Sequence, residues 1–186
     1  MNDADNVSFG KPKATGAVFV APYGTALPTN AHVALNAAFK GMGYVSEDGL
    51  VNSVEADTEE VNAWGGDLVL VGQTTFKETF MVNLIETNAE ALKVYYGSGN
   101  VVEEGNGSIT VTQSNEMLPN VSVVFDLVLT GGRTKRIVVP NAQIADRSGE
   151  ITYVDGEPIA YPALFVAYPD ANGDTHKEYI ATVLSS

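Results

Sequence analysis

Hydrophobic residues recur along the chain in short runs that clusters of glycine, proline, asparagine and aspartate separate. The runs are rich in Val, Ile, Thr, Tyr and Phe, residues that favour strands over helices. The alternation is clearest in residues 74–86, where Phe76 and Phe80 lie on one face of the expected strand and Lys77 on the other. We expect strands at residues 17–22, 39–46, 74–86, 108–113, 120–130, 133–144, 161–169 and 176–185.

One segment predicts a helix. Thr87 stands three residues before Glu90, which is the spacing of a capping box. Residues 89–93 are helix formers, and Gly97 is a natural C-terminal stop. The chain is therefore expected to be mainly β with one α-helix, an antiparallel β-sandwich or barrel with the helix packed on one side.

The length of 186 residues fits one domain. Residues 1–16 are polar and interrupted by glycine and proline, so they predict an extended N-terminal arm before a single β domain at 17–186. Residues 49–66 alternate only weakly and predict either a hairpin or a long projecting loop. The segments "LTGGRTKR" and "YPDANGDTHKEY" each predict a hairpin, because paired turn residues separate two strand candidates.

Charge is unevenly distributed along the chain. The net charge is −13, and residues 41–70 contain no lysine or arginine. An acidic protein repels phosphate backbones, so binding to nucleic acid by charge neutralisation is not expected. The acids of this window are Glu47, Asp48, Glu55, Asp57, Glu59, Glu60 and Asp67.

A basic cluster at residues 132–136 is the exception in this acidic chain. It is either a solvated hairpin end that protects a sheet edge or a docking partner for the acidic window of another copy. Complementary patches on one protein suit head-to-tail association into rings and filaments. The expected contact residues between copies are Glu55, Asp57, Glu59, Glu60, Trp64, Arg133, Lys135 and Arg136.

Motifs for catalysis, metal binding or cofactor binding are not found. The chain has no cysteine and two histidines, neither of them in a nucleophile signature. The glycines of "GGDLVLVG" lack the spacing of a phosphate-binding loop. "DANGD" starts like a calcium loop, but Thr175 and Ala181 replace the required glycine and glutamate. We therefore expect no enzyme activity, no cofactor and no metal.

The N-terminus lacks the features of a signal peptide, and no apolar run approaches the roughly 20 residues that span a bilayer. We expect a protein made in a cytoplasm, without a membrane anchor.

The order of segments resembles a known family. "NAWGGDLVLV" is followed by "TTFKETFMVNLIETNAEALKVYYG", "FDLVLTGGRTKRIVVPNAQI" and "ITYVDGEPIAYPALFVAYPDANGDTHKEY". Trp-Gly before a Phe-x-x-x-Phe strand, "LIE-x-N" at the entry to the helix and "YYG" at its exit carry the likeness. Over residues 40–181 the chain is similar to the major tail tube proteins of long-tailed, non-contractile bacteriophages.

The resemblance implies hexameric rings that stack into a tail tube, a conduit for DNA ejection. Each subunit would contribute strands to an inner β-barrel, with the helix outside. A long loop near 46–75 would reach the neighbouring ring, and the arm at 1–16 would help stacking. No additional immunoglobulin-like domain is expected. Some of the acids Asp67, Glu78 and Asp126 would then face the lumen.

The same resemblance implies partners and a location. The partners would be further copies of the chain and the tape measure, tail terminator and tail-tip proteins, while DNA passes without specific binding. The protein would be assembled in the host bacterial cytoplasm and reside in the virion tail.

Two alternatives stay open at this point. One is a secretion-system tube protein that shares the fold. The other is a β-sandwich that binds a small molecule or carbohydrate, with Trp64, Tyr95 and Tyr96 as a stacking platform. Trp64 itself either anchors the loop in its own subunit or contacts a subunit of the next ring.

Overall fold

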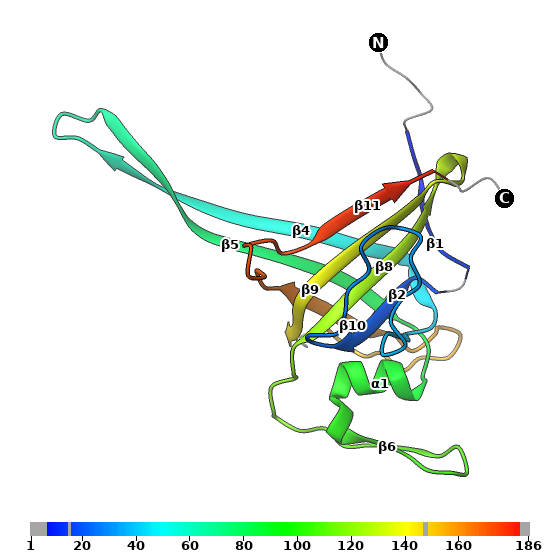
Figure 1. Ribbon diagram of the computed structural model, residues 1–186. Coiled ribbons are helices and arrows are strands. Elements are labelled where there is room, and N and C mark those ends of the chain that lie inside the picture. Colours follow the sequence, from blue (N-terminus) through cyan, green and yellow to red (C-terminus); the bar gives the residue numbers. More distant parts are fainter. Residues whose placement is uncertain (1–6, 15, 147–148, 183–186) are drawn as a thin grey trace.

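The computed structural model describes residues 7–14, 16–146 and 149–182. The described residues form β-strands, turns and the α-helix α1 (Ala89–Tyr96), which lies at one end of the molecule (Figure 1). The strands are β1 (Gly10–Pro12), β2 (Val18–Pro22), β3 (Lys40–Gly41), β4 (Val45–Asn62), β5 (Leu68–Leu84), β6 (Val101–Glu103), β7 (Ile109–Val111), β8 (Val121–Leu129), β9 (Thr134–Asp146), β10 (Tyr161–Ala167) and β11 (Lys177–Ala181). Two 3₁₀ turns, Ser98–Asn100 and Thr130–Gly132, complete the elements.

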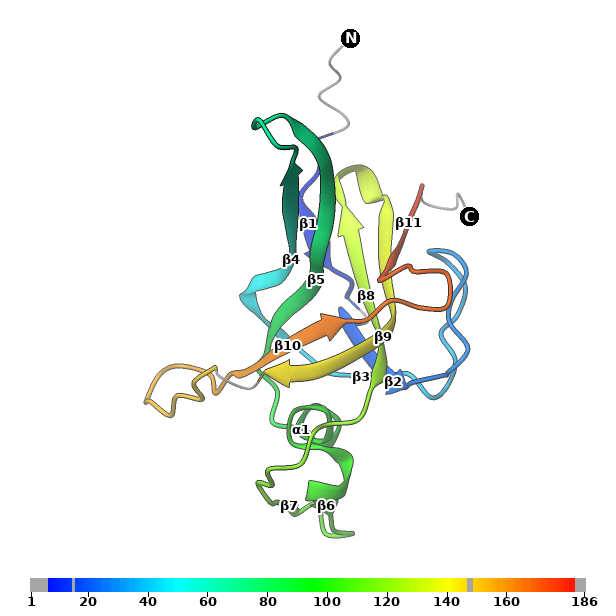
Figure 2. The ribbon, with the colours of Figure 1, turned by 90° about the vertical axis from the view of Figure 1, so that its left-hand side faces the viewer.

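The main sheet is antiparallel and has the strand order β3-β2-β8-β9-β10-β5-β4. β1 adds to β8, and β11 adds to β9. The sheet is strongly bent, so that β10 crosses beneath the upright pairs β4–β5 and β8–β9 (Figure 2). A separate small sheet contains β6 and β7. The predicted fold, mainly antiparallel β with one helix in the described residues, is confirmed.

The core lies inside this bend. Phe80, Phe125 and Phe165 are almost fully buried, and the ring centroids of Phe80 and Phe125 are 5.5 Å apart. Truncating a buried phenylalanine to alanine typically costs about 3–5 kcal/mol of stability. These three side chains come from β5, β8 and β10, so the core packs the central strands together. The distal parts of β4 and β5 contribute no buried side chain to it.

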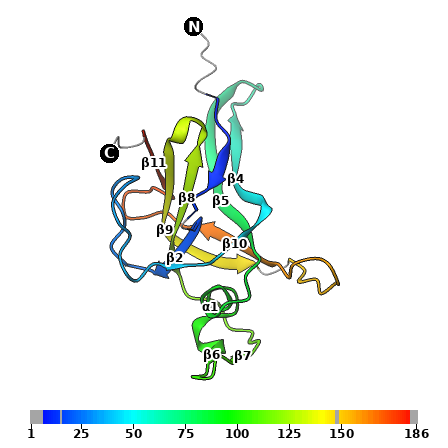
Figure 3. The same ribbon diagram turned by 90° about the vertical axis from the view of Figure 1, so that its right-hand side faces the viewer.

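The helix α1 closes one end of the core (Figure 3). It buries Leu92 and Tyr95, and it ends at Gly97, whose φ of 98° suits glycine. Its N-cap is Asn88, whose side chain accepts a hydrogen bond from the backbone N–H of Ala91 at 2.8 Å. The N-cap is therefore one residue later than predicted, and the predicted capping box does not form, because Ala91 occupies the N3 position. The Thr87 hydroxyl lies 3.2 Å from the Tyr161 hydroxyl instead.

One of the two predicted hairpins forms. β8 and β9 are joined by a turn in which Gly131 has a φ of 76°. The turn at residues 170–174 also forms, with the Gly173 N–H donating to Asp170 O at 3.0 Å, but β10 and β11 do not pair with each other. Both strands instead pair with successive lengths of β9, and the turn carries the chain from one to the other.

Candidate assembly surface

The strands β4 and β5 form a hairpin that extends far beyond the body of the molecule (Figure 1). The two strands have 18 and 17 residues. Residues 51–62 are all exposed, and residues 68–77 are exposed apart from Gly72, which is half-buried. Residues 49–66, predicted as a hairpin or a projecting loop, supply most of β4 and of the tip turn, and β5 forms the second strand of the hairpin. We call residues 51–77 the distal hairpin.

The distal hairpin is apolar as well as exposed. Trp64 has a relative exposure of 107%, and Leu70 one of 61%. The other large apolar residues exposed here are Val51, Val54, Val61, Leu68, Val69, Val71 and Phe76. A two-stranded ribbon is marginally stable by itself in water, and an apolar patch of this kind marks an interaction surface. The distal hairpin is therefore the candidate interaction surface of the described residues.

A tight turn at residues 63–67 forms the tip of the hairpin. Gly65 and Gly66 have φ values of 123° and 97°, which side-chain-bearing residues rarely adopt. The Ala63 N–H donates to Asp67 O at 2.8 Å, and nothing lies within 4 Å of where a Cβ of either glycine would stand. The glycines thus allow the backbone to adopt the positive φ values of this turn. The side chain of Trp64 is left exposed to solvent.

Acidic side chains line the same ribbon. Glu55, Asp57, Glu59 and Glu60 are all exposed on β4. Asp57 accepts a hydrogen bond from the Thr75 hydroxyl at 2.7 Å, and Glu55 lies opposite Lys77 in the strand register. Asp67 is exposed at the end of the tip. The distal hairpin combines apolar area with excess negative charge.

A buried carboxylate fixes the root of the hairpin. Glu78 is 1% exposed and accepts hydrogen bonds from Asn52 Nδ2 at 2.8 Å and from the Thr175 hydroxyl, while His176 Nδ1 lies 3.0 Å away. Burial raises the pKa of Glu78, but these hydrogen bonds outweigh it, so that the pKa lies below its ordinary value. β4, β5 and the segment before β11 are thereby held together.

A second buried charge pair joins β8 and β9. Arg136 Nε and Nη2 donate to the two carboxylate oxygens of Asp126 at 2.6 and 2.8 Å. Arg136 Nη1 also donates to the backbone oxygens of Asn30 and Val33. Removing one partner of such a pair typically costs about 3–5 kcal/mol. The pair therefore holds the loop between β2 and β3 on the sheet.

These contacts correct the predicted charge roles. Glu78 and Asp126 are buried and bonded within the chain, so neither presents its charge to a lumen in this structure, and only Asp67 of the three predicted acids is exposed. Arg136 is 3% exposed, so it is a structural residue instead of a contact. Spacing along the chain does not reveal that Asp126 and Arg136 meet.

The other two basic residues of the cluster also have partners in their own chain. Lys135 Nζ lies 2.7 Å from Glu178 Oε1. Arg133 Nη2 donates to the Ser8 hydroxyl, which ties the N-terminal segment to the β8–β9 turn. The predicted arm at 1–16 is described only in part: residues 7–14 and 16 include β1, which pairs with β8, and the remainder lies outside the described residues.

Comparison with protein families agrees with this architecture. Residues 5–182 match the sequence model of a family described as phage tail tube protein. The chain belongs to this family. No curated protein matched the sequence significantly. This tail tube protein is therefore a structural component of a phage virion, located in the tail, where copies assemble into a tube.

The geometry of the tail tube protein does not support the carbohydrate platform. Tyr95 is buried and packs on Tyr96 and Tyr161 with centroid distances of 5.0 and 5.7 Å. Trp64 belongs to the turn at 63–67. The tip of the β4–β5 hairpin lies far from α1 (Figures 1 and 2). The three aromatic side chains thus form no common surface.

Two further observations concern the described residues of the tail tube protein. No group of three or more histidine, aspartate or glutamate side chains among them is placed to hold a metal ion. None of the helices in this part of the chain is long and apolar enough to cross a membrane.

Sequence reasoning missed the exposure of residues 68–71. Their unbroken apolar run, "LVLV", is also typical of a buried core strand. The acidic window immediately before it is the one signal that could have indicated a projecting ribbon.

Proposed function

We propose that the protein forms hexameric rings that stack into the tail tube and that DNA is ejected through the central channel. The observation that carries the proposal is the distal hairpin, whose apolar side chains are exposed on a ribbon with no covering layer among the described residues. Such a ribbon is marginally stable in water by itself and gains stability when another molecule buries it.

The sheet edges support association within a ring. In the described residues β4 pairs only with β5, so its other edge has free backbone N–H and C=O groups along a long strand. Exposed edges of this kind pair readily with a strand of another chain. A ring in which each subunit adds strands to its neighbour would satisfy these groups.

The charge balance supports a conduit. The net charge of −13 makes a ring of copies strongly acidic, and duplex DNA is itself polyanionic. A wall of like charge lets DNA slide without adhering. Of the three predicted lumen acids, Asp67 is the exposed one, and it lies at the tip of the distal hairpin.

Electron microscopy of the purified, concentrated protein tests the proposal. We expect rings with six-fold symmetry, tubes built from them, and a channel wide enough for duplex DNA. A matched variant replaces residues 56–76 with Asn-Gly, because Glu55 and Lys77 lie opposite each other in the register and Asn-Gly closes a two-residue hairpin turn. This shortened variant keeps Glu78 and its partners, and we expect it to fold as a monomer without forming tubes.

Particles that stay monomeric at high concentration, or rings of another symmetry, would contradict the proposal. Tubes formed equally well by the shortened variant would show that the distal hairpin is not the assembling surface.

A further inference from the structure

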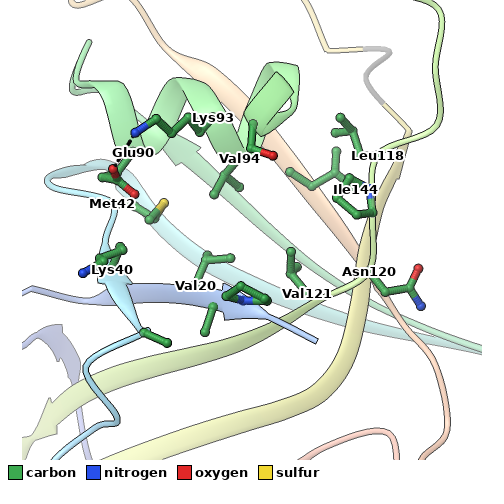
Figure 4. Close-up of a pocket in the computed structure, with 15 residues that line it drawn as sticks. Val20, Lys40, Met42, Glu90, Lys93, Val94, Leu118, Asn120, Val121 and Ile144 are labelled. Atoms are coloured by element: carbon green, nitrogen blue, oxygen red, sulfur yellow. Dashed lines mark hydrogen bonds and ion pairs between the residues drawn. The ribbon is translucent and has the colours of Figure 1, made fainter. Parts of the chain in front are cut away.

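An apolar groove lies at the end of the molecule that carries α1. It runs between α1 and the strands β2 and β3, it is closed by residues 118–121, and its volume is about 500 Å³ (Figure 4). Val20, Val94 and Val121 are among the aliphatic residues that line it. Lys40 and Lys93 lie at one side, away from Leu118 (Figure 4). We call this cavity the α1 groove.

We propose that the α1 groove receives the hairpin tip, residues 63–67, of a second copy, with Trp64 inserted among the aliphatic side chains. This inference rests on the proposed stacking of rings and deepens it, because it assigns the surface that the distal hairpin contacts.

The sizes agree. The volume of the groove, about 500 Å³, lies within the roughly 300–1,000 Å³ typical of ligand pockets. A tryptophan that enters such a pocket buries about 150–250 Å² of its surface. The groove therefore has room for the indole of Trp64 and an adjoining side chain of the tip. Binding hot spots are also enriched in tryptophan that packs in a desolvated pocket.

The charges are complementary. Glu59, Glu60 and Asp67 flank Trp64 on the tip, and the distal hairpin has no base before Lys77. Lys40 and Lys93 stand at the groove, where Lys93 pairs with Glu90 at 2.9 Å and Lys40 Nζ donates to the Ala37 backbone oxygen. Such lysine side chains are flexible, so they can turn toward incoming carboxylates.

The two surfaces also point in different directions. The hairpin tip and α1 lie at opposite ends of the molecule in two perpendicular views (Figures 1 and 2). A copy therefore cannot place its tip in its own groove. Docking between copies is head-to-tail, since each copy gives its tip to one neighbour and its groove to another, and such contacts continue along a stack.

Engineered disulfides test this arrangement, because the chain contains no cysteine. Ala63 and Ser98 are exposed, Ala63 adjoins Trp64, and Ser98 lines the groove. We expect Ala63→Cys with Ser98→Cys, oxidised after assembly, to give a ladder of covalent multimers that continues beyond the number of subunits in one ring.

Three controls accompany the double variant. Each single-cysteine variant should give no more than dimers. Ala63→Cys paired with Asn172→Cys, an exposed position in the 170–174 turn, should give no ladder. Adding Trp64→Ala to the test pair should reduce the ladder roughly tenfold or more, whereas Trp64→Phe should retain part of it.

Electron microscopy of the same samples before oxidation separates the two proposals. Tubes without a ladder would overturn groove docking and leave the tube intact, whereas an absence of tubes would overturn the proposed function. A ladder whose largest multimer has as many subunits as one ring would place the contact inside a ring and contradict docking between rings. Linkage of Ser98→Cys to a different tail protein in assembled virions would show that the groove has another occupant.

Discussion

At the scale of single residues, the acids of this chain divide into two groups that the sequence does not distinguish. Glu55, Glu59 and Glu60 are exposed on the distal hairpin, whereas Glu78 and Asp126 are buried and bonded. Glu78 is the most telling case because it continues the same strand as the apolar Phe80 and occupies the core-facing side. Its charge is stabilised by donors from two other segments, β4 and the residues before β11, and it therefore helps to fix how the hairpin leaves the body.

Replacing Glu78 with glutamine should destabilise the protein by about 1–3 kcal/mol at pH 7, because hydrogen bonds to a buried carboxylate are lost or weakened. The folded-state pKa of Glu78 lies below its ordinary value of 4.5. Its contribution is therefore complete above that value and is lost as the pH falls below it. Urea unfolding of both proteins from pH 7 to pH 3 measures this, and the difference between them should shrink in acid.

The control for that experiment is Glu55→Gln, on the same hairpin but exposed. Surface substitutions of this kind change stability by about 0.5 kcal/mol or less. A difference between wild type and Glu78→Gln that stays constant down to pH 3 would show that the charge of Glu78 is not what stabilises the root of the hairpin.

At the scale of elements, the sequence predicts most strands of the body but misses the longest strand, and it does not predict what covers the strands. Residues 45–62 form β4, where the pattern predicts a strand only at 39–46 and a hairpin or loop at 49–66. The alternation in 74–86 is confirmed where β5 meets the body, since Phe80 and Leu84 are buried, but Phe76 on the same face is 51% exposed. Periodicity reports which side chains favour burial, whereas the layer that covers them depends on distant segments or on other chains. For the same reason the α1 groove, built from segments far apart in sequence, could not be predicted.

Hydrogen exchange should divide the hairpin into two parts. In the monomer we expect amides at residues 53–61 and 69–77 to exchange quickly, because a ribbon without a covering layer opens at little cost in free energy. Residues 80–84 have core side chains and should exchange slowly. Mass spectrometry of monomer and assembled tube measures this, and assembly should protect the outer part.

Residues 122–125 of β8, which are buried, serve as the internal reference because their exchange should be slow in both states. Equal protection of the distal hairpin in monomer and tube would mean that the ribbon is stable alone and that assembly does not cover it.

At the scale of the whole molecule, stability and assembly are separated. The phenylalanine core of β5, β8 and β10 makes the body a complete folding unit, while the tip and the α1 groove leave apolar surface at the two ends. We therefore expect the body to fold without a neighbour and the apolar area outside it to be available for association. Assembly of such a subunit should then add to its stability.

The thermal midpoint should consequently depend on protein concentration. A partner that binds only the folded state, present at about a hundred times its Kd, adds about 2.7 kcal/mol. For a chain of this size about 1 kcal/mol corresponds to roughly 2–4 °C, so we expect the midpoint to rise by roughly 5–10 °C between dilute monomer and assembled protein in differential scanning calorimetry. The variant with residues 56–76 replaced by Asn-Gly retains the body and should show one midpoint at every concentration. A midpoint of the full chain that does not move while light scattering reports tubes would mean that assembly does not stabilise the folded subunit and that its apolar ends are not what the tube buries.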